Sequence, residues 1–175
     1  MDSAAVAEHV DKLAGEILGE FGPELSRVAF IGIQSSGVPL AHRIVRIIRE
    51  KTGVDCPAGM LDISMYRDDI GTRRGLPVIR ETEIPFDVNG QVVILTDAVI
   101  QTGRSIRAAL DAVTGYGRPA IIRLAVLVDR GLREYPISPD YTGVKLAADP
   151  GSRILVEWHE RNETDAGYEV PRQEA

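Results

Sequence analysis

Short, unbroken runs of apolar residues recur along the chain and alternate with segments of helical periodicity. Three of these runs have the length of strands: residues 28–33, 92–95 and 120–128, the last interrupted only by Arg123. Such runs are typical of strands that are buried on both faces of a parallel sheet. The pattern therefore predicts an α/β fold built on a mostly parallel central sheet.

Three segments show the periodicity of amphipathic helices. Apolar residues fall on one face from Ala4 to about Gly19, in a segment that begins near Pro39, and from Ser105 to Gly115 or Gly117. Apolar residues at positions i, i+3, i+4 and i+7 indicate a helix that turns one stripe toward the core. Because two of these helices directly follow apolar runs, we predict at least two strand–loop–helix units.

Weaker patterns complete the expected organisation. Apolar and polar residues alternate over residues 61–66, which predicts a half-buried strand. Residues 141–145 indicate a loop and residues 154–156 a last strand. We expect residues 1–160 to form a single domain and the polar residues 161–175 to form a frayed C-terminal tail.

A small, polar loop connects the run at 92–95 to the following helix. Asp97 precedes this loop, which contains Gln101, Thr102, Gly103, Arg104 and Ser105. The first N–H groups of a helix have no intrahelical partner, and the helix dipole is positive there. Gly103 lets the backbone approach a ligand closely and two hydroxyls add donors, so the loop is a candidate phosphate site. The alternative is an ordinary turn, with Ser105 as helix cap and Asp97 as a solvated carboxylate.

Composition narrows the class of protein. The chain has 175 residues, of which 44% are hydrophobic and 26% charged, as in ordinary globular proteins. No apolar run approaches the ~18 residues of a membrane span and no export signal is visible, so we expect a cytoplasmic protein with no membrane partner. A net charge of −6 argues against nonspecific binding of nucleic acid. Cys56 is the only cysteine, which excludes an intrachain disulfide.

Cations gather in two segments. The helix that begins near Pro39 carries His42, Arg43, Arg46, Arg49 and Lys51. These residues could form an anion-facing patch, or only a solvated face. The polar segment between Tyr66 and Ile84 carries Arg73, Arg74 and Arg80. A loop of this length could be a lid that closes over phosphates, or a mobile hairpin tip.

The stretch from Gln91 to Val113 resembles the PRPP-binding signature of type I phosphoribosyltransferases. That signature consists of an apolar strand, two acidic residues, two apolar residues, a variable residue and Thr-Gly-x-Thr/Ser. Four longer segments resemble the PyrR family, whose members are pyrimidine operon regulators and also uracil phosphoribosyltransferases. They are residues 61–69, 83–88, 117–119 and 124–137. The resemblance extends from about Val28 to Gly143.

The resemblance implies a fold, an activity and partners. The implied fold is the type I phosphoribosyltransferase fold: α/β, with a mostly parallel central sheet flanked by helices, a small hood and a flexible lid loop. The implied reaction converts uracil and PRPP to UMP and pyrophosphate with Mg²⁺, which is held mainly by the substrate. Many members also bind leader RNA of pyrimidine genes when UMP is bound. They assemble as homodimers or homotetramers.

The resemblance also assigns roles by position. Asp97 would hold a ribose hydroxyl as the catalytic residue, and Arg130 would lie by the uracil subsite. Ser36 and Gly37 would belong to the pyrophosphate loop, with Arg80 near the lid. Thr102, Gly103, Arg104 and Ser105 would hold the ribose phosphate. The other residues expected to bind PRPP or the nucleotide are Val99, Ile100 and Gln101.

Two departures from the family pattern fall in this expected site. The second acidic position of the signature is Ala98, and the pyrophosphate loop, typically Lys-Thr-Arg-Gly, is Gln34-Ser35-Ser36-Gly37. Because charge stabilisation contributes strongly to such catalysis, we expect nucleotide binding with weak turnover. The alternatives are a catalytically poor regulator that senses UMP or PRPP and binds RNA, and a phosphoribosyltransferase for another base. Asp11 on the expected first helix is unfavourable for RNA binding.

Overall fold

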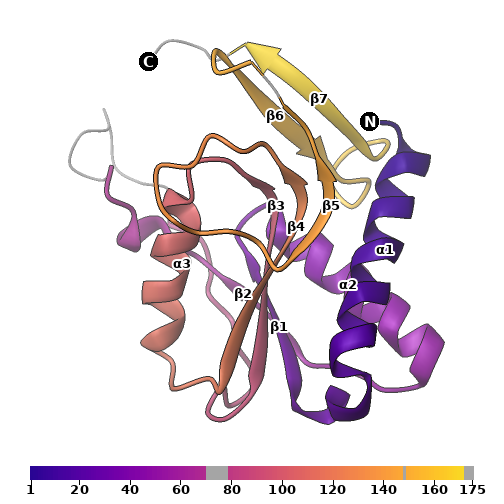
Figure 1. The fold of residues 1–175 in the computed structure, drawn as a ribbon. Helices are drawn as coiled ribbons and strands as arrows, with labels where there is room; N and C mark the ends of the chain where they lie inside the picture. The colour runs from indigo at the N-terminus through magenta and orange to yellow at the C-terminus, as the bar shows by residue number, and fades with distance from the viewer. Residues whose placement is uncertain (70–78, 148, 172–175) are drawn as a thin grey trace.

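A five-stranded parallel sheet forms the centre of the molecule, with helices on both faces (Figure 1). The computed structural model describes residues 1–69, 79–147 and 149–171. The strand order is β2-β1-β3-β4-β5. The strands are β1 (Val28–Ile33), β2 (Ala58–Leu61), β3 (Val92–Ile100), β4 (Ile121–Asp129) and β5 (Tyr141–Lys145). The predicted α/β fold with a mostly parallel sheet is confirmed.

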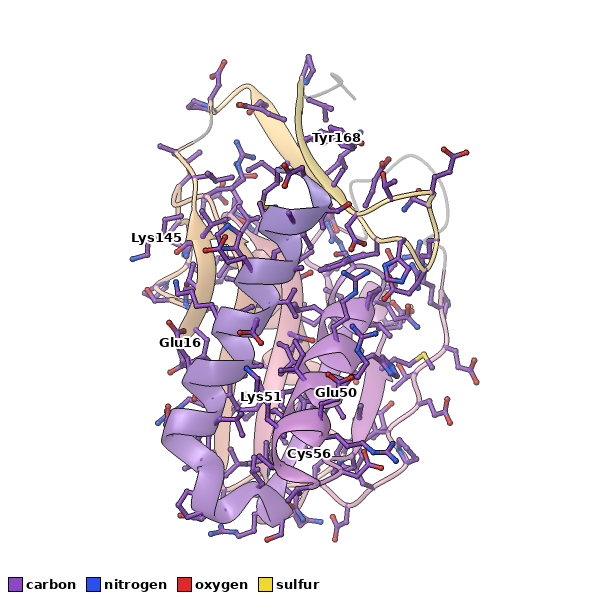
Figure 2. All side chains as sticks on the ribbon, turned by 90° about the vertical axis from the view of Figure 1, so that its right-hand side faces the viewer. Glu16, Glu50, Lys51, Cys56, Lys145 and Tyr168 are labelled. Atoms are coloured by element: carbon purple, nitrogen blue, oxygen red, sulfur yellow. The ribbon has the colours of Figure 1, made fainter. Side chains whose placement is uncertain are left out.

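Three helices cover the two faces of this sheet. They are α1 (Ser3–Phe21), α2 (Gly37–Thr52) and α3 (Arg104–Thr114), and a short 3₁₀ helix, η1 (Gly22–Arg27), joins α1 to β1. Figure 2 shows α1 and α2 side by side on one face, whereas α3 covers the other face in Figure 1. The helices predicted from periodicity are confirmed, with ends shifted by one to three residues.

Two apolar clusters hold the layers together. Alternate residues of β3 belong to different clusters, because successive side chains of a strand point to opposite faces. Val92 and Ile94 pack in the cluster that contains α1 and α2, while Val93 and Leu95 pack in the cluster that contains α3. This double burial explains why the strand has an unbroken apolar sequence.

The alternation over residues 61–66 does not form one strand. Strand β2 ends at Leu61, and Ser64–Tyr66 form a 3₁₀ turn, η2. Asp62 stabilises this turn because its Oδ1 accepts from the backbone N–H of Ser64 at 3.0 Å and from its hydroxyl at 2.6 Å. An Asx-type turn of this kind competes with strand formation.

The loop expected at Tyr141–Lys145 is the edge strand β5. Its polar composition predicted a loop, but two contacts with distant residues hold this segment at the edge of the sheet. The Tyr141 hydroxyl donates to Glu20 Oε2 at 2.5 Å. A Cβ on Gly143 would lie 2.6 Å from the carbonyl oxygen of Leu127 and 3.1 Å from Cβ of His9, so α1 and β4 both pass close to this strand. Neither contact is visible in the local sequence.

The tail expected to fray from residue 161 contains an ordered strand instead. Strand β7 (Ala166–Pro171) pairs antiparallel with β6 (Ser152–Glu157) to form a separate hairpin. The N-terminus fixes this hairpin, because the Met1 ammonium donates to the carbonyl oxygen of Gly167 and the Gly167 N–H donates to that of Met1, both at 2.9 Å. We call β6, β7 and the segment between them the hood.

The hood lies over the carboxyl end of β3 (Figure 1). Most of the expected lid, including Arg73 and Arg74, lies outside the described residues. Within the described residues, none of the helices combines the length and the apolar character needed to cross a membrane.

Candidate functional site

A cavity of about 210 Å³ opens at the carboxyl end of β3, between the sheet and the hood. In open parallel sheets, ligands bind at this edge of the strands. The cavity is lined by Asp97, Val99, Ile100, Gln101, Thr102, Gly103, Ser105, Ile106, Arg130, Arg153 and Ile154. Eight of the twelve residues assigned to the site from the sequence therefore surround one cavity. Ser36, Gly37, Arg80 and Arg104 do not line it.

Gly103 shapes the part of the cavity expected to bind phosphate. It is the N-cap of α3 and adopts the left-handed conformation with φ of 88°. Glycine adopts this conformation without strain, and here it has no side chain to block the first amides of the helix. Gly103 is the N-cap and Ser105 lies inside the helix, so the alternative in which Ser105 caps the helix is wrong.

The preceding residue anchors this loop to the segment after β4. The backbone carbonyl of Thr102 accepts from the N–H groups of Glu134 and Tyr135 at 2.9 and 3.0 Å. The Arg104 N–H donates to the Thr102 hydroxyl oxygen at 3.3 Å. These bonds fix the loop before any ligand arrives, which lowers the entropic cost of binding an anion.

Asp97 is the only carboxylate among the described residues that line the cavity. Its Oδ1 accepts from the Ala98 N–H at 2.8 Å and from the Ser36 hydroxyl at 3.2 Å. Burial raises the pKa of Asp97 to about 6, although these two donors oppose the rise. The carboxylate is therefore mostly ionised at neutral pH and can accept hydrogen bonds from sugar hydroxyls.

Ala98 faces away from this cavity. Its side chain is 1% exposed and belongs to the apolar cluster that contains α1, α2 and Trp158. A carboxylate at this position would have to leave water for an apolar environment, which is costly without a partner. The position of the missing second acid is thus occupied by an alanine that packs in the apolar core.

The loop from Gln34 to Gly37 lies beside Asp97. A Cβ on Gly37 would lie only 2.1 Å from the carbonyl oxygen of Thr96, and the Thr96 hydroxyl donates to the Gly37 carbonyl oxygen at 2.8 Å. The Gln34 side chain donates to the carbonyl oxygen of Glu81 at 3.1 Å. The peptide bond between Gln34 and Ser35 is cis. This loop contacts the site acid through Ser36 and contains no cationic side chain.

Two of the expected cations are engaged elsewhere. The Arg104 guanidinium donates to Glu134 and Asp68 and lies 5.3 Å from the ring centre of Tyr135. Only its backbone belongs to the phosphate loop. Arg80 is exposed, and its N–H donates to Asp62 Oδ2 at 2.8 Å, away from the cavity.

Arg130 is buried and lines the cavity while it anchors the hood. Its guanidinium donates to the Gln101 side chain at 3.0 Å and to the carbonyl oxygens of Ser152 and Asp149 at 3.0 and 2.9 Å. Its Nε is buried and has no hydrogen-bond partner within the described part of the chain. Arg130 therefore connects the phosphate loop to the hood and keeps one donor free.

The hood contributes two residues that were not expected at the site. Arg153 and Ile154 line the cavity from β6. The apolar run at 154–156 indicated a strand, but no local signal showed that this strand covers the site. The helix α2 also differs from the expected basic face, because Arg43 is only 6% exposed and is paired with acids of the hood.

Comparison with known proteins decides the family. A family model described as "Phosphoribosyl transferase domain" matches residues 2–160. The bifunctional protein PyrR of Roseiflexus sp. (strain RS-1) is 46% identical over 160 residues, which cover 91% of this chain and 87% of that protein. The bifunctional protein PyrR of Deinococcus deserti is 46% identical over 161 residues, which cover 92% and 87%. The chain belongs to the PyrR family.

The PyrR assignment agrees with the similarity of the fold to solved structures. The hypoxanthine-guanine phosphoribosyltransferase of Bacillus anthracis superposes with a TM-score of 0.67 at 18% identity, covering 84% of this chain and 82% of that one. Membership in the PyrR family therefore rests on sequence, and the type I phosphoribosyltransferase fold on both sequence and structure.

Proposed function

We propose that this PyrR-family protein transfers the phosphoribosyl group of PRPP to uracil, giving UMP and pyrophosphate. In this reaction the bond from uracil N1 to the ribose C1′ forms, the bond from C1′ to the pyrophosphate oxygen breaks, and the N1 proton leaves. The observation that carries the proposal is that Asp97 and the N-terminus of α3 line the same cavity. A sugar phosphate could contact both at once.

Each part of the cavity has a distinct task in this reaction. The phosphate of the ribose would bind to the amides and hydroxyls of Thr102, Gly103 and Ser105. Asp97 would accept hydrogen bonds from the ribose hydroxyls and so orient C1′ for attack. Arg130, which lines the cavity, would lie on the side toward the base. Positioning of this kind accelerates a reaction whose transition state resembles a ribosyl cation with a departing pyrophosphate.

Magnesium would neutralise the pyrophosphate and would be held mainly by oxygens of the substrate. Mg²⁺ bound to phosphates commonly retains several waters and few protein ligands. Among the described residues, Asp97 is the one carboxylate of the cavity. The ribose hydroxyls would engage it. We therefore assign no side chain of the protein to the metal.

We infer that turnover is weak. The leaving pyrophosphate would develop charge next to Gln34, Ser35 and Ser36, none of which is cationic. Loss of a preorganised group that stabilises the transition state lowers rates by roughly 10²–10³ in comparable cases. UMP formation from uracil, PRPP and Mg²⁺ tests both claims, with guanine and hypoxanthine as alternative bases. A slow but uracil-dependent rate is expected, and no product with any base would contradict the transferase.

The second candidate is a regulator that senses UMP or PRPP. The structural observation that favours it is the contrast between an intact phosphate loop and a pyrophosphate loop without cations. Separate titrations of UMP and PRPP distinguish the two functions, because a UMP sensor would bind UMP tightly and PRPP negligibly. We also propose cytoplasmic homodimers or homotetramers, which light scattering can test.

Binding of pyrimidine leader RNA is a weaker part of this proposal. Asp11 on α1 pairs with Lys51 at 2.7 Å, which neutralises a cation on the surface formed by α1 and α2. Phosphate contacts weaken steeply as salt rises, so binding should be sought first at low salt. A gel shift with leader RNA, with and without UMP, tests this activity, and no shift at low salt would remove it.

A further inference from the structure

Trp158 connects the hood to the candidate pyrophosphate loop. It directly follows β6, is 2% exposed, and donates a hydrogen bond from its indole N–H to the carbonyl oxygen of Ser36 at 3.0 Å. The Ser36 hydroxyl in turn donates to Asp97 Oδ1 at 3.2 Å. Two hydrogen bonds therefore lead from the hood to the acid in the cavity.

A buried arginine keeps the indole in place. The Arg43 guanidinium, from α2, lies 4.6 Å from the ring centre of Trp158. It donates to both oxygens of Asp165, at 2.7 and 2.8 Å, and to both oxygens of Glu160, at 2.7 and 2.8 Å. Bidentate pairs of this kind fix a planar guanidinium in orientation as well as in position. The tryptophan thus packs against a surface that cannot rotate away.

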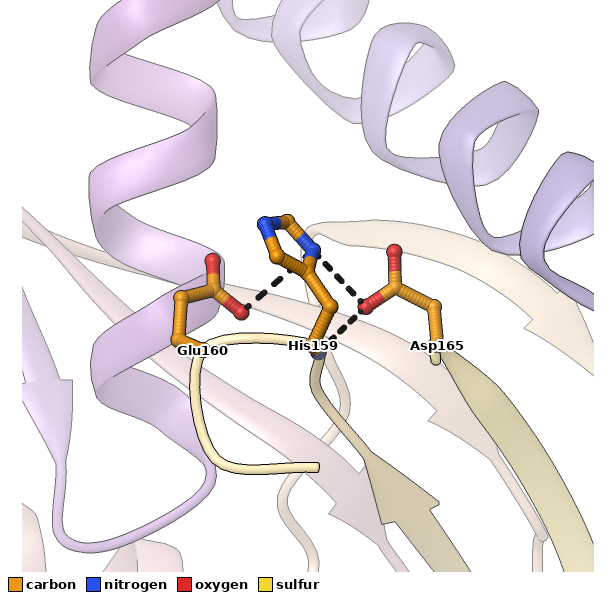
Figure 3. A group of neighbouring side chains, drawn as sticks. All are labelled: His159, Glu160 and Asp165. Carbon is orange, nitrogen blue, oxygen red and sulfur yellow. Dashed lines mark hydrogen bonds and ion pairs between the residues drawn. The ribbon is translucent and has the colours of Figure 1, made fainter. Parts of the chain in front are cut away.

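The acidic residues of the hood form ion pairs with Arg43. Figure 3 shows His159 between Glu160 and Asp165, a grouping that could suggest a cation site. Arg43, however, already places its charge against both carboxylates, and its Nη2 lies 2.6 Å from His159 Nδ1. The cluster is therefore the counter-charge of Arg43, and these contacts join α2 to the hood.

The hydrogen bond from Trp158 explains how the loop from Gln34 to Gly37, which has no cations, could still bind an anionic ligand. Ser35 and Ser36 can bind an anion only through backbone amides and hydroxyls, whose directions depend on the local peptide conformation. A loop that is fixed before binding loses less entropy when it binds. The hydrogen bond from Trp158 to the Ser36 carbonyl oxygen restrains the direction of that peptide.

We propose that Trp158 is a positioning residue for the pyrophosphate end of PRPP, acting through the Ser36 peptide, with Arg43 as its support. The proposal rests on the proposed function, because it requires PRPP to occupy this site. It assigns to the hood a role in binding one ligand and not another. UMP carries no pyrophosphate and would contact the loop after β3 without using the Ser36 peptide.

The test compares the affinities of UMP, PRPP and pyrophosphate for matched variants by calorimetry. Trp158→Phe keeps an aromatic ring against Arg43 and removes the indole N–H together with part of the buried ring. We expect it to bind PRPP and pyrophosphate about fivefold more weakly, the effect of one hydrogen bond, with UMP affinity unchanged. Tyr168→Phe is the control, because Tyr168 lies on the same hairpin, is 46% exposed and also loses a single donor (Figure 2). Tyr168→Phe should leave the affinities for UMP, PRPP and pyrophosphate unchanged.

A second measurement needs no variant. Trp158 is the only tryptophan of the chain, so the protein gives one indole N–H resonance. Pyrophosphate should shift this resonance and UMP should leave it nearly unchanged.

The outcomes separate the inference from the proposed function. If the wild-type protein binds neither UMP nor PRPP, the proposed function and the inference both fail. If it binds both ligands but Trp158→Phe weakens neither, or weakens both equally, only the positioning role is overturned. Binding of UMP without PRPP or pyrophosphate also overturns that role, since the loop would then have no ligand to position.

Discussion

The Ser36 hydroxyl donates to Asp97 Oδ1 at 3.2 Å, so the loop after β1 meets the end of β3 at a single carboxylate. That carboxylate is buried, and its ionised form is stabilised only in part by Ser36 and by the Ala98 N–H. An ionised group held in this way reduces the stability of the fold while it remains available to a ligand.

Asp97→Asn should therefore stabilise the protein at neutral pH. Burial raises the pKa of Asp97 to about 6 in the folded state, so the folded protein binds this proton more tightly than the unfolded chain. The ionised carboxylate then costs roughly 2–3 kcal/mol above pH 6, and the cost fades as pH falls through 6 toward 4. Urea denaturation should show Asp97→Asn to be about 2 kcal/mol more stable at pH 7 and nearly equal at pH 4.

An exposed acid provides the control for this stabilisation. Asp111, on α3, is 57% exposed at its side chain and pairs with Arg107 at 3.3 Å. Asp111→Asn should change the free energy of unfolding by less than about 0.5 kcal/mol at either pH. Equal effects of the two substitutions would show that burial of Asp97 carries no cost.

The affinity for UMP should fall as Asp97 is protonated. Below a pH of about 6 the carboxylate gains a proton and loses acceptor capacity for the ribose hydroxyls. We expect the affinity to fall about tenfold between pH 7 and pH 5 and then to level off at the affinity of the neutral side chain. The phosphate of UMP titrates in the same range, so Asp97→Asn serves as the reference that contains only the phosphate contribution. Parallel pH profiles of the two proteins would exclude Asp97 from the binding site.

The parts of the site that are formed by residues close together in the chain could be predicted from the sequence. The apolar run of β3, Asp97 and the glycine-containing loop lie within about a dozen positions, and their order alone places an acid beside a helix N-terminus. The structure brings them around one cavity. The length of β3 was underestimated, because Asp97 and Ala98 interrupt the apolar run without ending the strand.

The parts that depend on distant contacts could not be predicted. Strand β7 is ordered by hydrogen bonds between Gly167 and Met1, at opposite ends of the chain. Arg43 looked like one cation of a basic helix face, yet the carboxylates that bury it come from residues more than a hundred positions away. The periodicity of one segment contains no information about its contacts with a distant segment. The position of the hood over the site could therefore not be predicted from the sequence.

Gln34→Lys should raise turnover by supplying a cation to the pyrophosphate loop. Gln34 is partly exposed, and a lysine there could also donate to the carbonyl oxygen of Glu81. We expect about a tenfold gain in kcat/KM for PRPP from one added charge near the leaving group. Gln34→Met, similar in length and uncharged, is the control. Ala98→Asp should not help, because it would bury a carboxylate in the apolar cluster.

Gly103→Ala should weaken both folding and phosphate binding. With φ of 88° an alanine would be strained, and its Cβ would lie 3.2 Å from Cβ of Tyr135. We expect a loss of about 1–2 kcal/mol in the free energy of unfolding and weaker binding of UMP. Gly15→Ala, in α1, has open space around its Cβ and should instead stabilise the protein by about 0.5–1 kcal/mol. Thermal unfolding of both variants distinguishes conformational strain from a general response to added methyl groups.

Arg43→Met should be the most destabilising of these substitutions, because it leaves the two carboxylates of the hood without their cation. Removing one partner of a buried ion pair costs about 3–5 kcal/mol. Arg46→Met is the control on the same helix, since Arg46 is exposed and lies 3.9 Å from exposed Glu50.

Acid denaturation tests whether Arg43→Met loses stability because the charge of Arg43 is removed. Hydrogen bonds from Arg43 lower the pKa of Asp165 to about 2, so the folded protein binds this proton more weakly than the unfolded chain. That contribution, about 2 kcal/mol, is fully present above pH 4 and is lost as pH falls toward 2. The decline should be smaller in Arg43→Met, and Asp165→Asn should partly rescue that variant, because it removes a charge that has no partner. If the double variant is no more stable than Arg43→Met, the guanidinium contributes packing against Trp158 and not charge.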